Sequence, residues 1–331
     1  MGHRKYSSPR RGSMAFYPRS RAGSFESRIR TWHDVHLEKP HLMGFAGFKV
    51  ATLTVMTVDN REKTPNFGKS LLNPSTLIAT PPVKIIGIRG YNETSMGKRV
   101  VFDFFTKETD KNLKRKAPFK NEKGKLESAV SFKDKVSDVR AVVSVSPASI
   151  SLPQKKPFVW EMPISAKDNL TKIQFAKENL GREFTVKDVF QPGQFIDVSA
   201  ITRGKGVEGP ITRFGVKRKQ HKSRKSVRAV GTLGPISPAV VMYTVPRQGQ
   251  HGFHQRTEYN KRVLLISSDQ KDGSVNSTGG FDHFGRFKGD YIIVRGSVPG
   301  VPKRLIKMRM PIRKQHKKII EPKIIEVILR K

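Results

Sequence analysis

The residues with the clearest potential for chemistry are Gly204, Gly206 and Gly209, which have the spacing G-x-G-x-x-G after a predicted strand. In a dinucleotide-binding fold this spacing opens a helix whose N-terminus holds the pyrophosphate. Here Pro210 and a basic run follow the third glycine, and the acid expected about twenty positions later to hold a ribose is absent. We therefore expect no cofactor. The glycines instead allow close approach to a phosphate backbone, because no Cβ intervenes.

The chain becomes strongly basic directly after these glycines. Residues 210–230 include eight Lys and Arg and no acid, whereas a solvated charged surface normally mixes both signs. Adjacent cations displace the counterions of a phosphate backbone and supply affinity that does not depend on base sequence. The candidate contacts to RNA in this segment are Arg203, Gly204, Lys205, Gly206, Gly209, Arg213, Lys217, Arg218, Lys219, His221, Lys222, Arg224, Lys225 and Arg228.

A turn rich in glycine and proline follows at residues 231–238. Two prolines and two glycines disfavour a helix there, so this stretch is either an ordinary loop or the tip of a long projection. The tip would consist of Gly234, Pro235, Ile236, Ser237 and Pro238. Residues 247–256 then mix guanidinium, amide, imidazole and aromatic groups, the set that contacts folded RNA. The candidate contacts there are Arg247, Gln248, Gln250, His254 and Arg256.

The N-terminal thirty residues form a third basic segment, with eight Lys and Arg and a single acid, Glu26. Glycine, serine and proline punctuate the segment, and no hydrophobic period emerges. It is therefore either a disordered tail or an arm that becomes ordered against RNA. As candidate RNA contacts we take His3, Arg4, Lys5, Arg10, Arg11, Arg19 and Arg21.

Catalytic and metal-binding patterns are weak or missing. The chain has no cysteine, which excludes disulfides, thiolate chemistry and cysteine-based zinc sites. His33, His36 and His41 form one histidine group, and His251 and His254 form another, but both lie among basic residues that would repel a cation. We find no nucleophile elbow, no Walker loop and no paired carboxylates set apart for acid–base work. We expect a protein that is not an enzyme, with no metal, no cofactor and no small-molecule substrate.

The overall charge narrows the class of partner. The chain has 64 Lys and Arg against 27 Asp and Glu, a net charge of +37 over 331 residues. Such an excess is typical of proteins whose charge a polyanion neutralises, most commonly nucleic acid. No apolar run approaches the roughly 18 residues that a membrane span needs. We expect a soluble, cytoplasmic protein without a membrane partner, although composition by itself does not distinguish RNA from DNA.

Hydrophobic patterns predict a mainly β fold with some helix. Strands are expected at 48–58, 83–88, 100–105, 140–145, 194–202, 239–245, 263–267, 290–294 and 323–329. The clearest helix is expected from Ser165, as its cap, to Leu180, with Asp168 in the capping-box position and Gly181 after its end. Residues 107–135 are predicted to be an exposed insertion with some helix. Many short strands with few helices favour a small closed barrel.

Together these residues resemble a known family. Phe190, Asp197, Ala200, Thr202, Gly204, Lys205, Gly206, Gly209 and Arg213 match the signature of the universal large-subunit ribosomal protein family three. Residues 3–22, 248–257 and 279–300 are also similar to members of this family, so the resemblance covers nearly the whole chain. The short C-terminus resembles that of the archaeal type.

The resemblance implies a β-barrel similar to the second domain of translation GTPases, with an inserted helical region and long basic extensions. It implies four parts: a basic extension at 1–43, the first part of the barrel at 44–202, a basic projection at 203–260, and the completion of the barrel with a basic tail at 261–331. Members bind large-subunit rRNA early in assembly, lie beside other large-subunit proteins, and send the projection towards the peptidyl transferase centre. Many members have Trp at the apex where this chain has Ile236.

Overall fold

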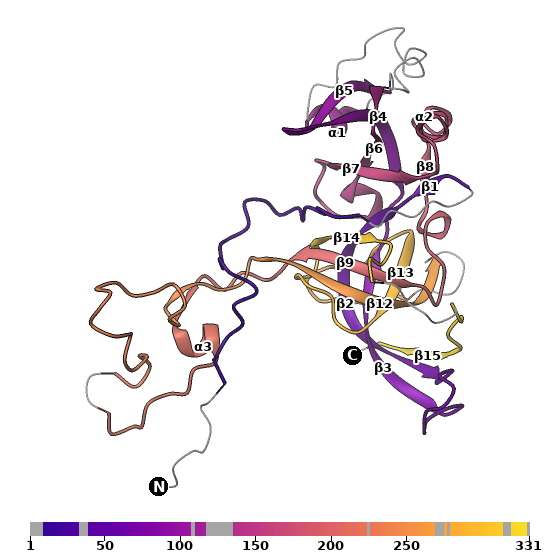
Figure 1. The fold of residues 1–331 in the computed structure, drawn as a ribbon. Helices are drawn as coiled ribbons and strands as arrows, with labels where there is room; N and C mark the ends of the chain where they lie inside the picture. The colour runs from indigo at the N-terminus through magenta and orange to yellow at the C-terminus, as the bar shows by residue number, and fades with distance from the viewer. Residues whose placement is uncertain are drawn as a thin grey trace. The chain divides into compact units, whose positions relative to one another are not determined.

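The computed structural model describes residues 9–32, 39–106, 110–116, 135–223, 226–268, 275–276, 279–313 and 319–329. The elements, in chain order, are β1 His41–Leu42, β2 Gly44–Val58, β3 Ser70–Ala79, β4 Val83–Thr94, β5 Gly97–Phe105, α1 Lys111–Lys114, β6 Asp138–Val145, the 3-10 helix Pro147–Ile150, β7 Phe158–Ser165, α2 Asn169–Glu178, β8 Glu183–Phe184, the 3-10 helix Val186–Asp188, β9 Phe195–Ile201, β10 Val207–Glu208, α3 Pro210–Phe214, β11 Gly249–Gln250, β12 Gln255–Ser268, β13 Asp290–Arg295, β14 Leu305–Arg309 and β15 Ile324–Ile328. The fold is mainly β, with few helices (Figure 1).

Six strands pair into a closed ring, in the order β14–β9–β12–β13–β3–β2, with β2 pairing back to β14. The long strand β2 makes the closure possible. Its first part, residues 44–48, pairs with β14, and its last part, residues 54–57, pairs with β15 outside the ring. The β-branched residues of β2 suit this pleated, largely buried position.

One hydrophobic core is shared by the strands of the ring and by β4, β6 and β7. Phe45 from β2, Ile196 from β9 and Ile292 from β13 are almost fully buried, and Phe48, on the opposite face of β2 from Phe45, packs against Phe158 of β7. Along β9, Ile196, Val198 and Ala200 are buried on one face, and Asp197 and Ser199 are buried on the other. Both faces of this strand are therefore covered by protein.

A second antiparallel sheet has the order β1–β7–β6–β4–β5, with β8 paired to β4. Helix α2 packs against β4 and β6 and buries Ile173 and Ala176, which lie three positions apart on one face of the helix. The predicted start of this helix is wrong. Ser165 ends β7 and pairs with His41, so α2 begins later, with Asp168 as its N-cap.

Other predictions differ from the structure where pairing partners matter. The strand predicted at residues 239–245 is wrong. All of these residues are described, none pairs with another strand, and the apolar side chains at 240–243 are exposed. Strands β3 and β7 were not predicted, and each contains a proline, Pro74 and Pro163. The predicted insertion at 107–135 lies largely outside the described residues; α1 is its described helical part.

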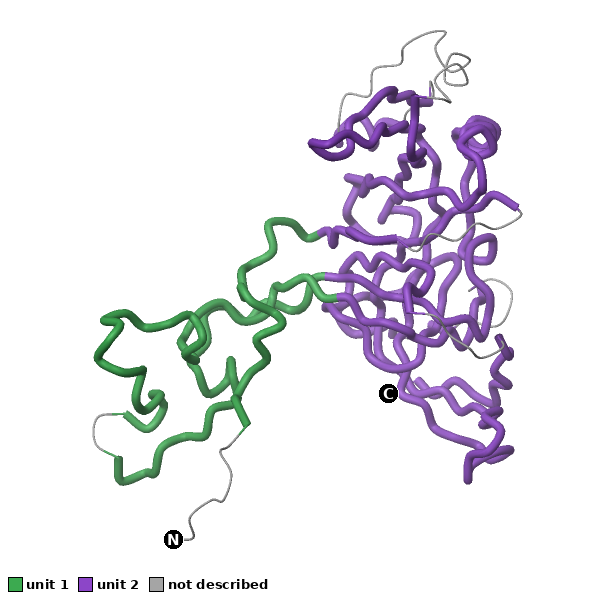
Figure 2. The backbone as a smooth tube through the Cα atoms, viewed as in Figure 1, with its two compact units in different colours: residues 1–25, 201–256 green, residues 26–200, 257–331 purple. Residues whose placement is uncertain are grey.

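The chain divides into two compact units (Figure 2). The smaller unit consists of residues 1–25 and 201–256, and the larger unit consists of residues 26–200 and 257–331. The second sheet and nearly all of the ring belong to the larger unit, whereas all of the candidate RNA contacts belong to the smaller one. None of the described helices is both long and apolar enough to cross a membrane.

Candidate nucleic-acid interface

The smaller unit concentrates positive charge. Its 81 residues include eighteen Lys and Arg and a single acid, Glu208, which gives a net charge of +17. Among its described residues, the buried apolar side chains are Ile201 and Phe214. The unit therefore has almost no hydrophobic core of its own, and hydrogen bonds must account for much of its order.

Backbone pairing between two glycine-containing segments forms the spine of the smaller unit. Residues 207–208 pair with 249–250 as β10 and β11. The pairing continues through Lys205 N to His251 O at 2.9 Å, His251 N to Gly206 O at 2.8 Å, and Thr202 N to His254 O at 2.9 Å. The glycines of the G-x-G-x-x-G pattern thus lie along an extended two-stranded ribbon.

Gly252 is required in this ribbon. It has a φ of +71°, and a Cβ at this position would lie 2.0 Å from the carbonyl oxygen of Arg203. By contrast, a Cβ on Gly206 or Gly209 would meet no described protein atom within 4 Å. The surface beside these two glycines is therefore open to a partner.

A short helix follows the third glycine, contrary to the expectation of a simple basic run. Gly209 is the N-cap of α3 and Pro210 is its first residue, a position where proline is favoured because its missing N–H needs no partner. The helix ends after five residues, at Phe214, and Gly215 follows in the left-handed conformation. It is too short to be the amphipathic helix of a dinucleotide-binding motif.

Two predicted RNA contacts, Arg19 and Arg213, are bonded within the smaller unit. Arg213 donates from Nε to Gln250 O at 3.0 Å and from Nη1 to Arg247 O at 3.2 Å. Arg19 donates from Nη1 to Arg213 O at 2.7 Å. Both guanidinium groups lie against the Phe214 ring, 4.2 Å and 5.2 Å from its centroid. These two arginines connect the N-terminal arm, α3 and the segment before β11.

His254 and Gln250 also have internal partners. His254 is buried, and its Nδ1 lies 2.9 Å from Ser20 O. Because a carbonyl only accepts, Nδ1 carries the hydrogen. Burial lowers the pKa of His254, which favours the neutral ring. Gln250 donates from Nε2 to Gly252 O at 3.0 Å. Arg256 is partly buried and lies over the Phe16 ring at 4.6 Å.

The other described candidates are exposed, and no ion pair to a carboxylate involves them within the described part of the chain. They are Arg10, Arg11, Arg21, Arg203, Lys205, Lys217, Arg218, Lys219, His221, Lys222, Arg228, Arg247 and Gln248. Arg10 additionally donates to Thr244 O at 2.5 Å. His3, Arg4, Lys5, Arg224 and Lys225 lie outside the described residues.

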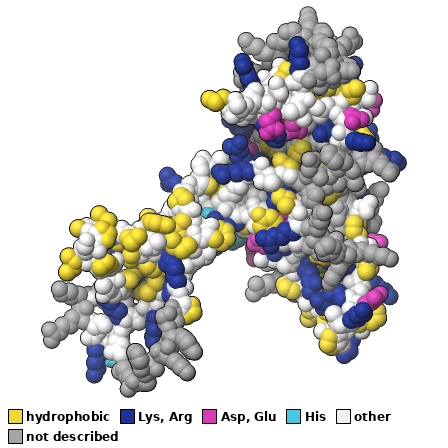
Figure 3. Space-filling model, in the orientation of Figure 1, with side chains coloured by type: hydrophobic (Ala, Val, Ile, Leu, Met, Phe, Trp, Pro, Cys, Tyr) yellow, Lys and Arg dark blue, Asp and Glu magenta, His cyan; other side chains and the backbone are white. Residues whose placement is uncertain are grey.

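Exposed apolar side chains accompany these cations. All five residues of the predicted tip, 234–238, are exposed, and Ile236 has 96% of its surface accessible. Val240, Val241, Met242 and Tyr243 are exposed as well. The hydrophobic pattern of residues 239–245 was interpreted as a strand, so this apolar surface was missed. Figure 3 shows hydrophobic side chains gathered on the visible face of the smaller unit.

The signature residues divide between the two units. Phe190, Asp197 and Ala200 are buried in the larger unit, whereas Gly204, Lys205, Gly206 and Gly209 are in the smaller one. Asp197 forms an ion pair with Arg309 at 3.2 Å. Its carboxylate also accepts hydrogen bonds from the backbone N–H groups of Asn260 at 3.0 Å and Ile312 at 3.2 Å. Part of the signature therefore stabilises the ring and does not contribute to an exposed binding surface.

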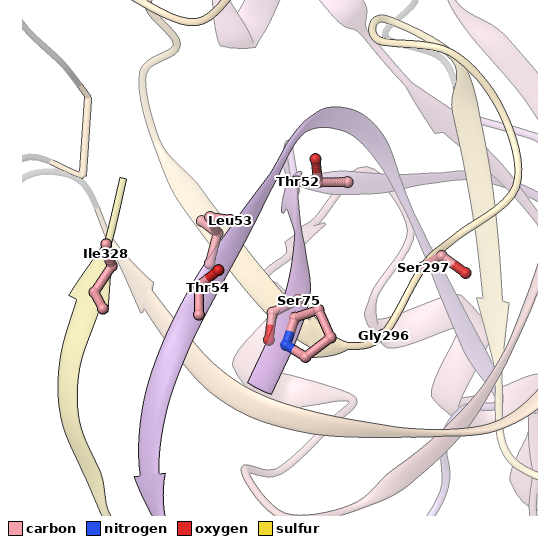
Figure 4. Close-up of a pocket in the computed structure, with 8 residues that line it drawn as sticks. Thr52, Leu53, Thr54, Ser75, Gly296, Ser297 and Ile328 are labelled. Atoms are coloured by element: carbon pink, nitrogen blue, oxygen red, sulfur yellow. The ribbon is translucent and has the colours of Figure 1, made fainter. Parts of the chain in front are cut away.

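The larger unit contains a pocket of about 430 Å³ beside β2, β3 and β15 (Figure 4). Its lining offers the hydroxyl groups of Thr52, Thr54, Ser75 and Ser297 and apolar groups such as Ile328. Among the described residues, no charged side chain contributes to this lining. Among the described residues, no group of three or more His, Cys, Asp or Glu is placed to hold a metal ion.

Comparisons with known proteins identify the chain. The family model of ribosomal protein L3 matches residues 1–329. The large ribosomal subunit protein uL3 of Pyrobaculum aerophilum is 43% identical over 333 residues, covering 98% of each chain. The corresponding proteins of Methanothermobacter thermautotrophicus and Methanococcoides burtonii are 37% and 40% identical, and cover 97% and 98% of this chain and 96% and 97% of their own lengths.

These matches define a ribosomal protein and not an enzyme. More specifically, the chain belongs to the ribosomal protein L3 family, and its relatives include archaeal members. The resemblance seen in the sequence is confirmed.

Proposed function

We propose that this protein is a structural constituent of the large ribosomal subunit that binds large-subunit rRNA directly through its smaller unit. The observation that carries the proposal is a net charge of +17 on 81 residues whose described part buries only two apolar side chains. Such a segment gains little from packing on itself. A polyanion would supply both the neutralising charge and the surface against which it is ordered.

The exposed side chains suit a folded RNA. Cations such as Lys217 and Arg218 would displace counterions from the phosphate backbone. The glycines at 206 and 209 would allow a sugar–phosphate backbone to approach closely, since no described protein atom occupies the space beside them. Ile236 and the apolar side chains at 240–243 would contact unstacked bases or sugars, which RNA offers in loops and bulges. Binding of this kind holds distant RNA segments together without catalysis.

Four internal contacts narrow the set of direct RNA contacts. Arg19, Arg213, Gln250 and His254 are bonded to the backbone of the smaller unit, so we propose that they hold the interface in shape. The exposed cations would then make most of the phosphate contacts. His3, Arg4, Lys5, Arg224 and Lys225 remain proposed contacts on the basis of the sequence.

Finer features of the family are proposed with the same function. The closed pairing of six strands supports a β-barrel like that of the second domain of translation GTPases. The division of the chain near residues 201 and 256 supports a central extension inserted between barrel strands. The family resemblance supports a direction for this extension, towards the peptidyl transferase centre, and neighbouring large-subunit proteins as further partners.

A triple substitution tests the proposal. Replacing Lys217, Arg218 and Lys219 by Ser should reduce incorporation into large subunits, because each lost phosphate contact weakens RNA binding. Each loss should also reduce the magnitude of the slope of log affinity against log salt by about 0.9. All three side chains are exposed, so the unfolding temperature should not change. Incorporation is measured by reconstituting archaeal large subunits that lack their own family member and separating them on a sucrose gradient.

The matched control replaces Lys155, Lys156 and Lys187, three exposed lysines of the larger unit, by Ser. This variant loses the same charge and should be incorporated normally. Equal incorporation of both triple variants at equal stability would mean that the cations at 217–219 are ordinary surface charge.

A further inference from the structure

A narrow recess in the larger unit lies beside the end of β2. Residues of β2, β3, β12 and β13 line it, among them Arg262 and Arg295, together with Asp59, Asn60 and Arg61, which follow β2. It holds about 10 Å³ of empty space, which is room for about one oxygen atom. All of the residues that line the recess belong to the larger unit.

Three arginines and two asparagines among the lining residues bring hydrogen-bond donors to the recess, and Asp59 is its one carboxylate among the described lining residues. Arg262 donates from Nη1 to Asn60 Oδ1 at 3.2 Å and from Nη2 to Ile320 O at 2.8 Å. Because a guanidinium group only donates, the oxygen of the Asn60 amide must face Arg262. Its Nδ2 is therefore turned away, and this buried nitrogen has no hydrogen-bond partner among the described residues. Such a donor normally finds an acceptor.

The positive charge at the recess is only partly balanced. Asp59 is occupied by Arg61, which donates from Nε at 2.8 Å and from Nη2 at 2.7 Å to its two oxygens. Within the described residues, neither Arg262 nor Arg295 forms an ion pair with a carboxylate. Burial and then the charge of Arg295 lower the pKa of Arg262, whereas Asp59 raises it. The positive charges of Arg262 and Arg295 therefore repel each other, and a bound anion would lower the free energy of this repulsion.

We propose that the recess formed by Asn60, Arg262 and Arg295 binds one phosphate of an RNA backbone, as a second RNA contact outside the smaller unit. A non-bridging phosphate oxygen would accept from Asn60 Nδ2, and Arg262 and Arg295 would supply positive charge on the same recess. The larger unit has a net charge of +20, which favours a polyanion over an acidic segment of a protein. This inference rests on the proposed function, because it assumes that RNA is the partner.

Charge-removing variants measure the contact. Arg295→Gln should weaken binding of the full chain to a transcribed archaeal large-subunit rRNA by about fivefold at 0.15 M salt and lower the slope against log salt by about 0.9. Arg295→Lys keeps the charge and should keep the slope. The matched control is Arg99→Gln, which removes an exposed arginine of β5 and should leave the slope unchanged.

The absence of cysteine allows a positional test as well. An iron chelate that cleaves nearby RNA can be attached to a single cysteine, either at Glu62→Cys near the recess or at Ser237→Cys in the smaller unit. Both positions are exposed. We expect each probe to cut the rRNA, at different nucleotides, and Arg295→Gln to reduce the cuts from the Glu62 position only.

The outcomes separate the two proposals. Cleavage from Ser237→Cys without cleavage from Glu62→Cys, with Arg295→Gln behaving like Arg99→Gln, would overturn the recess as an RNA contact and leave the proposed function intact. It would then favour an acidic protein neighbour for Arg262 and Arg295. Cleavage from neither position would overturn RNA binding itself, and the recess with it.

Discussion

At the scale of single residues, Lys307 is an unusual member of the ring. It lies on β14 and is almost fully buried. Its Nζ is 3.8 Å from Glu26 Oε2 and 4.8 Å from the centroid of the Trp160 ring. Glu26 also pairs with Lys116 at 3.1 Å, so one carboxylate serves two cations. Burial lowers the pKa of Lys307 to about 8, against the raising effect of Glu26 and with a further lowering by Lys116.

This pKa predicts a specific pH dependence of stability. Between pH 8 and about 10.5 the unfolded chain binds the Lys307 proton more strongly than the folded chain, so the free energy of unfolding should rise with pH in that window. The rise should be about 2–3 kcal/mol. It should disappear in Lys307→Met, as measured by urea unfolding from pH 7.5 to 10.5. Lys187→Met, at an exposed position, is the control; identical curves for the two variants would contradict the assignment.

At the scale of elements, Asp197 connects three parts of the ring. It lies on β9, pairs with Arg309 of β14, and accepts the backbone N–H of Asn260 within β12. Strands β9 and β12 are the ones that lead into and out of the smaller unit. Asn260 has a φ of +55°, a conformation in which its N–H can meet the Asp197 carboxylate. A buried carboxylate thus fixes the strands on which the central segment begins and ends.

Breaking this pair should be costly. Arg309→Met would leave the Asp197 carboxylate buried without its cation, which destabilises a protein by about 3–5 kcal/mol. The double variant Asp197→Leu with Arg309→Met should lose less, because no uncompensated charge remains. Urea unfolding of the two variants at one pH measures the difference. A loss below about 1 kcal/mol for Arg309→Met would mean that water, rather than Arg309, solvates Asp197.

Much of the ring was predictable because its strands carry their own signal. The apolar run of β13 predicts a strand at nearly the observed bounds, whereas the strands predicted for β2 and β12 begin four and eight residues after the observed starts. Strand β14 was not predicted, because Lys307 and Arg309 interrupt its apolar pattern. Both are buried in the structure, where Glu26 and Asp197 from distant parts of the chain pair with them. Strand β3 was not predicted either, because it contains Pro74, and proline is disfavoured within a strand. Ring closure depends on pairing between strands about 260 residues apart, which no local pattern encodes.

The candidate interface was predictable as a charged segment and less so in its details. The run Lys217–Lys219 is exposed, as its composition suggests. Arg19 and Arg213 look the same in sequence, yet a hydrogen bond between positions 194 apart gives them an internal role. The recess at Arg262 and Arg295 has no local motif, because its members come from different strands.

At the scale of the whole molecule, charge and core are distributed unequally. The larger unit has a hydrophobic core and a net charge of +20 over 250 residues, whereas the smaller unit has a net charge of +17 over 81. Self-repulsion of that density opposes a compact state in isolation. If the smaller unit binds rRNA as proposed, RNA contributes to its stability as well as being its ligand.

The most direct test of the central claim is the salt dependence of binding to a transcribed archaeal large-subunit rRNA. If the smaller unit neutralises six to ten phosphates, the affinity of the full chain should fall by about 10³–10⁵ between 50 mM and 200 mM salt. The plot of log affinity against log salt should be linear. An affinity that stays constant over this range would contradict the account, because it would leave the cations of the smaller unit without phosphate partners.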